Sequence, residues 1–248
     1  MQPTAILSAL AEEQHGLIDL LQQAHKTSHA GREFWQGELH GQPVVLALSK
    51  IGKVAAATTA TALIERFGVA RMVFTGVAGG LGARVQVGDV VVATEFLQHD
   101  LDVSPLFPRY EVPFYGKARF ESDPALTALL HAAATAALAA PELGAGRLFP
   151  QACVHSGLLA SGDRFVSGAD EARALHATLS GAGHAVLAVE MEGAAVAQVC
   201  LDYGVPFAAM RTISDRADDS AHVDFSSFVQ QVASQYAHRI IGRFLGLL

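Results

Sequence analysis

The stretch that decides the fold is Ala188-Val189-Glu190-Met191-Glu192-Gly193, where an apolar run with strand character ends in two carboxylates. The stretch Arg211-Thr212-Ile213-Ser214-Asp215 repeats this arrangement with a single carboxylate at its end. A third acidic group, Glu12-Glu13, follows the apolar run at residues 5–10. Ligands of open α/β sheets bind beyond the carboxyl ends of the strands. We therefore expect these acids to border one ligand site.

The composition indicates one large globular domain over residues 1–248. Hydrophobic residues make up 51% of the chain and charged residues 17%, a balance that favours a large core over disorder. A chain of this length buries roughly 70–75% of its unfolded surface, so it needs no disulfide or metal to fold. The formal net charge is −7 and the basic residues are scattered, which argues against a nucleic-acid-binding surface.

The start of the chain and its cysteines indicate a cytoplasmic protein. The first residues are apolar only as far as Ala11, lack a basic lead-in and run into Glu12-Glu13. We therefore expect neither a signal peptide nor a membrane span. Cys153 and Cys200 could form a disulfide, but two buried thiols in a reducing cytosol are the favoured interpretation.

Segments typical of strands and helices alternate along the chain, with no linker and no internal repeat. This alternation predicts a single-domain three-layer α/β/α fold with a central, mostly buried mixed sheet. A glycine-rich turn is expected at residues 76–80, and a Pro/aromatic loop at 103–116. The expected strands cover residues 4–10, 32–39, 44–48, 72–75, 89–96, 154–160, 185–189 and 206–213. The expected helices cover residues 12–24, 53–67, 124–139, 192–203 and 225–246.

Each acidic motif also has a purely structural interpretation. Glu190 and Glu192 point to opposite sides if the strand continues, and acids are favoured at helix N-termini in any case. Asp215 in a dry pocket would have a raised pKa and could donate a proton, whereas an Asx turn or a helix cap explains it when it is taken alone. Glu12-Glu13 could cap a helix or supply a general base. The amides of residues 76–80 suit an anion or sugar hydroxyls, or form only a tight turn.

The sequence argues against several common kinds of site. His15, His99, His155 and His222 show no metal-ligand spacing, and there is no His-Glu-x-x-His or Cys-x-x-Cys motif. The glycine spacing from Gly76 is wrong for dinucleotide binding, and no Gly-x-Ser-x-Gly elbow exists. We therefore expect neither a metal nor a cofactor.

Taken together and in order, these motifs resemble the purine nucleoside phosphorylase/uridine phosphorylase superfamily. The most similar branch is hydrolytic: the 5′-methylthioadenosine/S-adenosylhomocysteine nucleosidases. The resemblance spans nearly the whole chain and implies a nucleoside phosphorylase-like fold. Its most specific strings are Val-Glu-Met-Glu at 189–192 and Ile-Ser-Asp-x-Ala-Asp at 213–218. The other matching segments are residues 9–13, 51–57, 75–81, 87–91, 99–103 and 161–165.

The resemblance implies a role for each matching residue. Glu13 would be the general base, Glu192 would bind the ribose hydroxyls, and Asp215 would protonate or hydrogen-bond adenine N7. Val103 and Leu106 would reach into the neighbouring subunit's pocket, which implies a homodimer. The remaining expected substrate-binding residues are Met191 against the sugar, Phe165 stacked on the base, Val166 through its backbone, Ile51 and Phe225 around the 5′ substituent, and Val77, Ala78, Gly79 and Glu190, with Arg211 and Ser214 in support.

Two departures from the related phosphorylases favour water over phosphate as the nucleophile. Those enzymes hold phosphate with an Arg before the glycine-rich turn and a Ser or Thr within it, whereas this chain has Phe74 and Val77. A phosphate dianion beside Glu12-Glu13 without basic partners would be poorly stabilised. Many of the nucleosidases also have Ser or Thr at the position of Val77, and the loop at 104–116 differs from the family in length and content.

The resemblance therefore implies a hydrolase that releases adenine from 5′-thio-substituted nucleosides, without metal or cofactor. Proton transfer by positioned groups such as Glu13 and Asp215 typically contributes about 10²–10⁴ in rate. A second possibility is hydrolysis of another 6-amino purine nucleoside, such as aminodeoxyfutalosine or 5′-deoxyadenosine. A third is a catalytically silent nucleoside-binding protein. The expected partners are a small-molecule nucleoside and a second copy of the chain, with no nucleic acid and no membrane.

Overall fold

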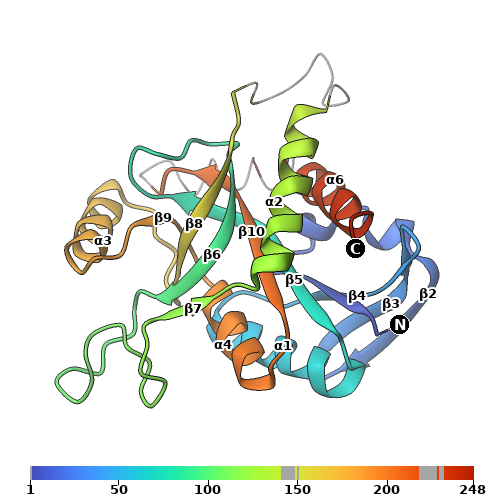
Figure 1. Cartoon of the computed structure of the whole chain (residues 1–248), viewed down its shortest axis with the longest axis horizontal. Helices are drawn as coiled ribbons and strands as arrows, with labels where there is room; N and C mark the ends of the chain where they lie inside the picture. Colours follow the sequence, from blue (N-terminus) through green and yellow to red (C-terminus); the bar gives the residue numbers. More distant parts are fainter. Residues whose placement is uncertain (1, 141–148, 150, 218–227, 229–231) are drawn as a thin grey trace.

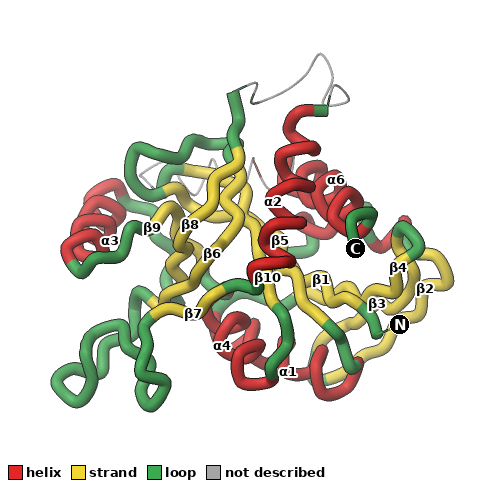
Figure 2. Tube along the Cα trace, viewed as in Figure 1, coloured by secondary structure: helices red, strands yellow, loops and turns green. Residues whose placement is uncertain are grey.

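A computed structural model of the chain describes residues 2–140, 149, 151–217, 228 and 232–248 (Figure 1). Strands and helices alternate along it, as the sequence predicts (Figure 2). The strands are β1 (Thr4–Ser8), β2 (Gln22–His29), β3 (Arg32–Leu39), β4 (Gln42–Leu48), β5 (Arg71–Gly80), β6 (Val90–Gln98), β7 (Arg119–Glu121), β8 (Val154–Ser161), β9 (Val186–Glu190) and β10 (Phe207–Asp215). The α-helices are α1 (Lys53–Phe67), α2 (Pro124–Ala139), α3 (Ala169–Gly181), α4 (Gly193–Tyr203) and α6 (Ser234–Leu245).

The described strands form one mixed sheet that partly closes on itself. Its order is β10-β6-β8-β9-β5-β1-β4-β3-β2, and β10 pairs with β5 as well as with β6. The strands β5, β10, β6, β8 and β9 therefore form a closed ring, from which β1, β4, β3 and β2 extend. Parallel pairs such as β1 with β5 occur beside antiparallel pairs such as β6 with β10. This confirms the prediction of a mixed sheet.

Helices cover the sheet on opposite sides, as the predicted layering requires. Leu63 of α1 is fully buried in one hydrophobic cluster with Phe74 of β5, and α4 contributes to the same cluster. Leu130 of α2 and Ile240 of α6 are fully buried in a second cluster. Figure 1 shows α1 and α4 together on one side of the strands and α2 and α6 together on another. The layered arrangement of helices around a central mixed sheet, expected from the sequence, is confirmed.

Closure of the ring brings the ends of three strands to one place. Gly79 near the end of β5 pairs with Val189 of β9 and also with Asp215 of β10. Because β9 runs antiparallel to β5 while β10 runs parallel to it, the acidic ends of β9 and β10 meet across the end of β5. The acids therefore converge through ring closure and not along the edge of an open sheet.

Some sequence predictions are wrong in detail. The helix expected at 12–24 is replaced by two 3₁₀ turns, Glu12–Gln14 and Ile18–Leu20, and by β2. Gly16, with a positive φ of 85°, interrupts the first segment, and antiparallel pairing with β3 makes residues 22–29 a strand. The glycine-rich segment 76–80 is not a turn but part of β5, because it pairs with β10 and β9.

Other boundaries and burials also differ. The predictions omit β7 and α3, and residues 225–227 and 229–231 of the last expected helix lie outside the described residues. Cys200 is buried and Cys153 is exposed, and both are free, so the expectation of two buried thiols is wrong for Cys153. Helix 53–67 is confirmed and ends at Gly68, which has a left-handed φ of 59°. Among the described residues, no helix combines the length and apolar character that crossing a membrane requires.

The packing of α2 gives a stability prediction. Leu130→Ala removes a fully buried side chain from the cluster that α2 and α6 share, and should lower the free energy of unfolding by about 2–5 kcal/mol. The matched control is Leu201→Ala in α4, where the side chain is 48% exposed and the loss should stay below about 1 kcal/mol. Urea unfolding of both variants measures the difference. Equal losses would contradict this assignment of the core.

Candidate functional site

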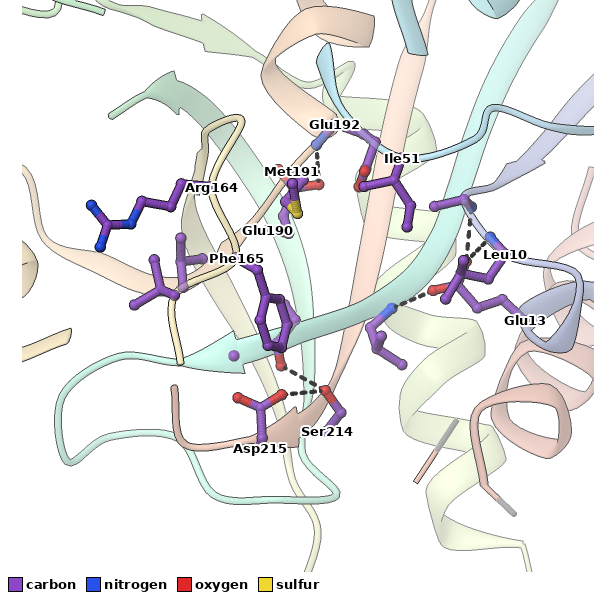
Figure 3. A pocket seen from close by; sticks show the side chains of 16 residues that line it. Leu10, Glu13, Ile51, Arg164, Phe165, Glu190, Met191, Glu192, Ser214 and Asp215 are labelled. Carbon is purple, nitrogen blue, oxygen red and sulfur yellow. Dashed lines mark hydrogen bonds between the residues drawn. The ribbon is translucent and has the colours of Figure 1, made fainter. Parts of the chain in front are cut away.

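A cavity of about 410 Å³ opens where the strand ends meet, and Glu13, Glu192 and Asp215 all line it. Figure 3 shows the three carboxylates approaching the cavity from different sides. Pockets of roughly 300–1,000 Å³ with mostly apolar walls and a few convergent polar groups are typical of small-molecule sites. The lining residues are Ala9, Leu10, Glu13, Ile51, Val77, Ala78, Gly79, Arg164, Phe165, Val166, Val189, Glu190, Met191, Glu192, Ser214 and Asp215.

Glu13 is held by three backbone amides and is only 3% exposed. Its Oε2 accepts hydrogen bonds from the backbone N–H groups of Ala9 at 2.8 Å and Leu10 at 2.9 Å, and its Oε1 accepts from Val77 at 3.1 Å. Burial raises the pKa of Glu13, and these bonds together with the charge of Arg211 oppose the rise. A buried carboxylate with a raised pKa suits a general base.

The neighbouring strand leaves room for this carboxylate. A Cβ at Gly76 would lie 3.0 Å from Oε1 of Glu13, closer than most side-chain contacts. The sequence motif at residues 76–80 is therefore explained in part by the close approach of a carboxylate to β5, and not by turn geometry.

Glu190 and Arg211 form a buried ion pair behind the cavity. Arg211 Nη2 donates to Glu190 Oε2 at 2.6 Å, and both side chains are almost fully buried. The guanidinium also lies over the ring of Phe74, 4.2 Å from its centroid. Glu190 further accepts the hydroxyl of Ser161 and the backbone N–H of Gly193 at 2.8 Å. Glu190 is thus committed to structure, although it also touches the cavity.

Of the two acids Glu190 and Glu192, Glu192 is the one that remains available to a ligand. It is the N-cap residue of α4, and its Oε1 accepts the backbone N–H of Gly52 at 2.8 Å. Burial, followed by the nearby charge of Glu190, raises the pKa of Glu192 to about 8, and the charge of Arg211 opposes the rise. β9 ends at Glu190, so the strand alternation considered from the sequence does not extend to Glu192, and both acids line the cavity. They differ in their partners: Glu190 binds the guanidinium of Arg211, whereas Glu192 binds the backbone amide of Gly52.

Asp215 lies at the end of β10 and is 2% exposed. Ser214 Oγ donates to its Oδ2 at 2.8 Å, and the backbone N–H of Ala217 donates to its Oδ1 at 2.8 Å. A Cβ at Gly79 would lie 3.0 Å from both Asp215 Oδ1 and the Cβ of Ala217, so a larger residue there would crowd the carboxyl group. Hydrogen bonds on both oxygens fix the orientation of the carboxyl group toward the cavity.

Apolar side chains form the rest of the expected site. Met191, Phe165, Val166 and Ile51 all line the cavity, and Phe165 remains 42% exposed. Phe225 lies outside the described residues. Val103 and Leu106 do not line the cavity of their own chain. Arg211 supports the site from behind, as expected, and Val77, Ala78, Gly79 and Ser214 are lining residues.

Four lining residues were not among the predicted site residues. Ala9, Leu10 and Val189 belong to the predicted motifs. Their closeness in sequence to Glu13 and Glu190 could have identified them as lining residues. Arg164 precedes Phe165, and its Nε lies 2.7 Å from Glu171 Oε1. Within the described residues, no group of three or more His, Cys, Asp or Glu side chains could hold a metal ion.

Comparisons with known proteins identify the same family that the sequence motifs resemble. The model of the Phosphorylase superfamily matches residues 3–246. The 5′-methylthioadenosine/S-adenosylhomocysteine nucleosidases of Bacillus thuringiensis (strain Al Hakam) and Bacillus anthracis are each 38% identical to this chain over 238 residues. The match covers 96% of this chain and 96% of each relative.

Two solved structures are similar over their full length. The 5′-methylthioadenosine/S-adenosylhomocysteine nucleosidase from Neisseria meningitidis in complex with methylthio-immucillin-A has a TM-score of 0.87 and 34% identity, with 100% of both chains covered. A futalosine hydrolase mutant of Helicobacter pylori strain 26695 has a TM-score of 0.86 and 31% identity, again with 100% of both chains covered.

The raised pKa of Glu192 predicts a pH-dependent stability. The unfolded chain releases this proton near pH 4.5, whereas the folded chain keeps it to about pH 8, so the folded state binds more protons between these values. The stability that Glu192 contributes is therefore complete below pH 4.5 and falls as the pH rises to about 8. The free energy of unfolding of the wild type minus that of Glu192→Gln, measured with urea, should decrease through this window. A constant difference would contradict the raised pKa.

Proposed function

The chain belongs to the Phosphorylase superfamily, and from this premise we propose that it hydrolyses the N-glycosidic bond of 5′-thio-substituted adenine nucleosides. The substrates are 5′-methylthioadenosine and S-adenosylhomocysteine, and the products are adenine and the 5-thio-ribose. The observation that carries this proposal is the convergence of Glu13, Glu192 and Asp215 on one cavity. The similar nucleosidases from Bacillus and Neisseria support it.

The geometry supports a division of labour among the three acids. Cleavage of the bond leaves an oxocarbenium-like sugar and an anionic base. Asp215, buried at the end of β10, would stabilise the base by giving or sharing a proton at adenine N7. Glu13 would take a proton from the attacking water, and Glu192 would accept hydrogen bonds from the ribose hydroxyls.

Water is favoured over phosphate as the nucleophile because the cavity lacks a suitable anion site among the described residues. Phe74, which stands where related phosphorylases have an Arg, is fully buried under Arg211. Arg211 is engaged with Glu190, and Arg164, the only Lys or Arg among the described residues that line the cavity, is paired with Glu171. A phosphate dianion beside these carboxyl groups would therefore have no basic partner and would be poorly stabilised.

A second candidate is hydrolysis of another 6-amino purine nucleoside such as aminodeoxyfutalosine. The similarity to the futalosine hydrolase of Helicobacter pylori favours it, with almost the same TM-score as the Neisseria nucleosidase. The two candidates share the chemistry at the base and differ in the 5′ substituent, for which Ile51 forms part of the wall. Adenine release from a panel of nucleosides that differ at C5′ separates them.

The decisive assay for the proposed function is adenine release from 5′-methylthioadenosine with and without phosphate. We expect turnover that does not depend on phosphate. Turnover only in the presence of phosphate would identify a phosphorylase, and binding without turnover would identify a silent nucleoside-binding protein.

Asp215→Asn tests the proposed acid. The substitution preserves the shape of the side chain but removes the proton that the leaving base needs, so kcat should fall by at least ~10². The matched control is Asp170→Asn on α3, where the side chain is 97% exposed and kcat should not change. Steady-state kinetics measure both variants. Near-normal turnover by Asp215→Asn would remove this residue as the acid.

We further propose that residues 1–248 form one domain and that two copies form a cytoplasmic homodimer. One continuous sheet through the described residues supports the single domain. Exposed apolar side chains in the 103–116 loop support the dimer, since Leu106 is 79% exposed and Phe114 94% exposed.

Sedimentation velocity tests the dimer. We expect the chain to sediment as a dimer at the micromolar concentrations used for assay, because burial of Leu106 and its neighbours favours association. Leu106→Asp should shift the distribution toward monomer and lower the activity together. A fully active wild-type monomer would contradict a pocket that is shared between subunits.

A further inference from the structure

A cluster of three charged residues, which we name the Asp163 latch, joins two loops at the cavity. It consists of Asp163, Lys53 and Asp100. Asp163 Oδ1 accepts the backbone N–H of Lys53 at 2.8 Å, and the backbone N–H of Asp163 donates to Asp100 Oδ2 at 2.8 Å. Lys53 Nζ closes the cluster, at 2.5 Å from Asp100 Oδ1 and 3.9 Å from Asp163 Oδ2.

The latch connects two different walls of the cavity. Lys53 is the first residue of α1 and follows directly on Ile51, which lines the cavity, and Gly52, whose amide holds Glu192. Asp163 lies two residues before Phe165, which lines another wall. In Figure 3, Ile51 and Glu192 lie along one side of the cavity, whereas Phe165 reaches into it from the loop that follows β8.

The contacts of the latch fix the backbone of the loops. Two of them use backbone N–H groups, so they hold the path of the chain and not only a side-chain tip. The approach is close: a Cβ at Gly52 would lie 3.1 Å from Asp163 Oδ1, and Gly52 has a positive φ of 96°. Lys53 is only 16% exposed, which places its charge-assisted bonds in a partly desolvated setting.

The start of the loop that carries Asp163 is also held by His99, the residue that follows β6. The backbone N–H of His99 donates to Ser161 O at 2.9 Å, and the imidazole packs so closely that a Cβ at Gly162 would lie 2.3 Å from Nε2. The start of the loop is therefore fixed by β6. The latch then determines where the following residues, and with them Phe165, stand relative to α1.

We propose that Asp163 is a positioning residue that sets the separation between the Phe165 wall and the Ile51–Glu192 wall before substrate binds. This inference rests on the proposed function for the meaning of the two walls. A preorganised cavity gains affinity because no loop has to be ordered on binding. Contacts to the adenine ring through Phe165 are equally present in substrate and transition state, so loss of the latch acts mainly on KM.

The experiment compares three variants with 5′-methylthioadenosine as substrate. Asp163→Ala removes the acceptor for the Lys53 amide, and we expect KM to rise about tenfold with kcat within about threefold of the wild type. Asp163→Asn keeps an oxygen that can accept this bond, so its KM should stay within about threefold of the wild type. Asp170→Ala, which removes an exposed acid on α3, is the control and should change neither constant.

Two kinetic outcomes overturn the proposal. One is an Asp163→Ala variant that behaves like the Asp170→Ala control. The other is a fall in kcat with an unchanged KM, which would place Asp163 in the chemical step. Circular dichroism verifies folding, and if Asp163→Ala does not fold, Asp100→Ala replaces it, because that change removes the acceptor for the Asp163 amide.

A second readout separates this inference from the proposed function. Trypsin cleavage after Arg164, identified by mass spectrometry of the substrate-free protein, reports opening of the loop independently of any reaction. We expect cleavage about tenfold faster in Asp163→Ala than in Asp163→Asn or Asp170→Ala. If the wild type releases no adenine, the proposed function fails, and the cleavage rates alone test the latch. Faster cleavage of Asp163→Ala than of the two other variants supports the latch, and equal rates overturn it.

Discussion

The buried ion pair between Glu190 and Arg211 is the interaction on which the site depends. Several acids lie close together where water is largely excluded, and uncompensated charges there would cost several kcal/mol each. Arg211 supplies the compensation: it binds Glu190 directly and its charge opposes the raised pKa values of Glu13 and Glu192. Its own burial is tolerated because its guanidinium lies over Phe74 and donates to backbone carbonyls. The phenyl ring of Phe74 therefore stabilises this buried cation through its face.

The closed ring of strands converts this electrostatic arrangement into a site. β5 lies between β10 and β9, and its glycines leave space where carboxylates approach: Gly76 for Glu13 and Gly79 for Asp215. Backbone amides then orient each acid separately. The result is three carboxyl groups with different surroundings in one cavity, which is the usual condition under which a fold assigns different proton-transfer roles to chemically similar groups.

The sequence predicted much of the fold because hydrophobic alternation is a local signal. It predicted most of the site through the resemblance that its motifs carry together, because each acidic motif taken alone also had a purely structural explanation. Helix 53–67, the mixed sheet and the lining of the cavity by Glu13, Glu192 and Asp215 could be predicted. The strand at Gln22–His29 could not, because it is polar and exposed and exists through its pairing with β3. The strand pairing of residues 76–80 could not be predicted from the sequence either, because glycines usually indicate turns. The division between Glu190 and Glu192 was open until the positions of Arg211 and Gly52 were known.

The place of β10 in the ring has a consequence for the order in which the protein matures on the ribosome. Glu13 is synthesised well before Arg211 and Asp215, which belong to β10, the last strand among the described residues. A nascent chain that ends before Phe207 contains Glu13, Glu190 and Glu192 but lacks both Arg211, the ion-pair partner of Glu190, and the strand that closes the ring. In such a chain, burial of Glu190 without its guanidinium partner would cost several kcal/mol. The pocket is thus completed only when the C-terminal segment emerges and inserts between β5 and β6.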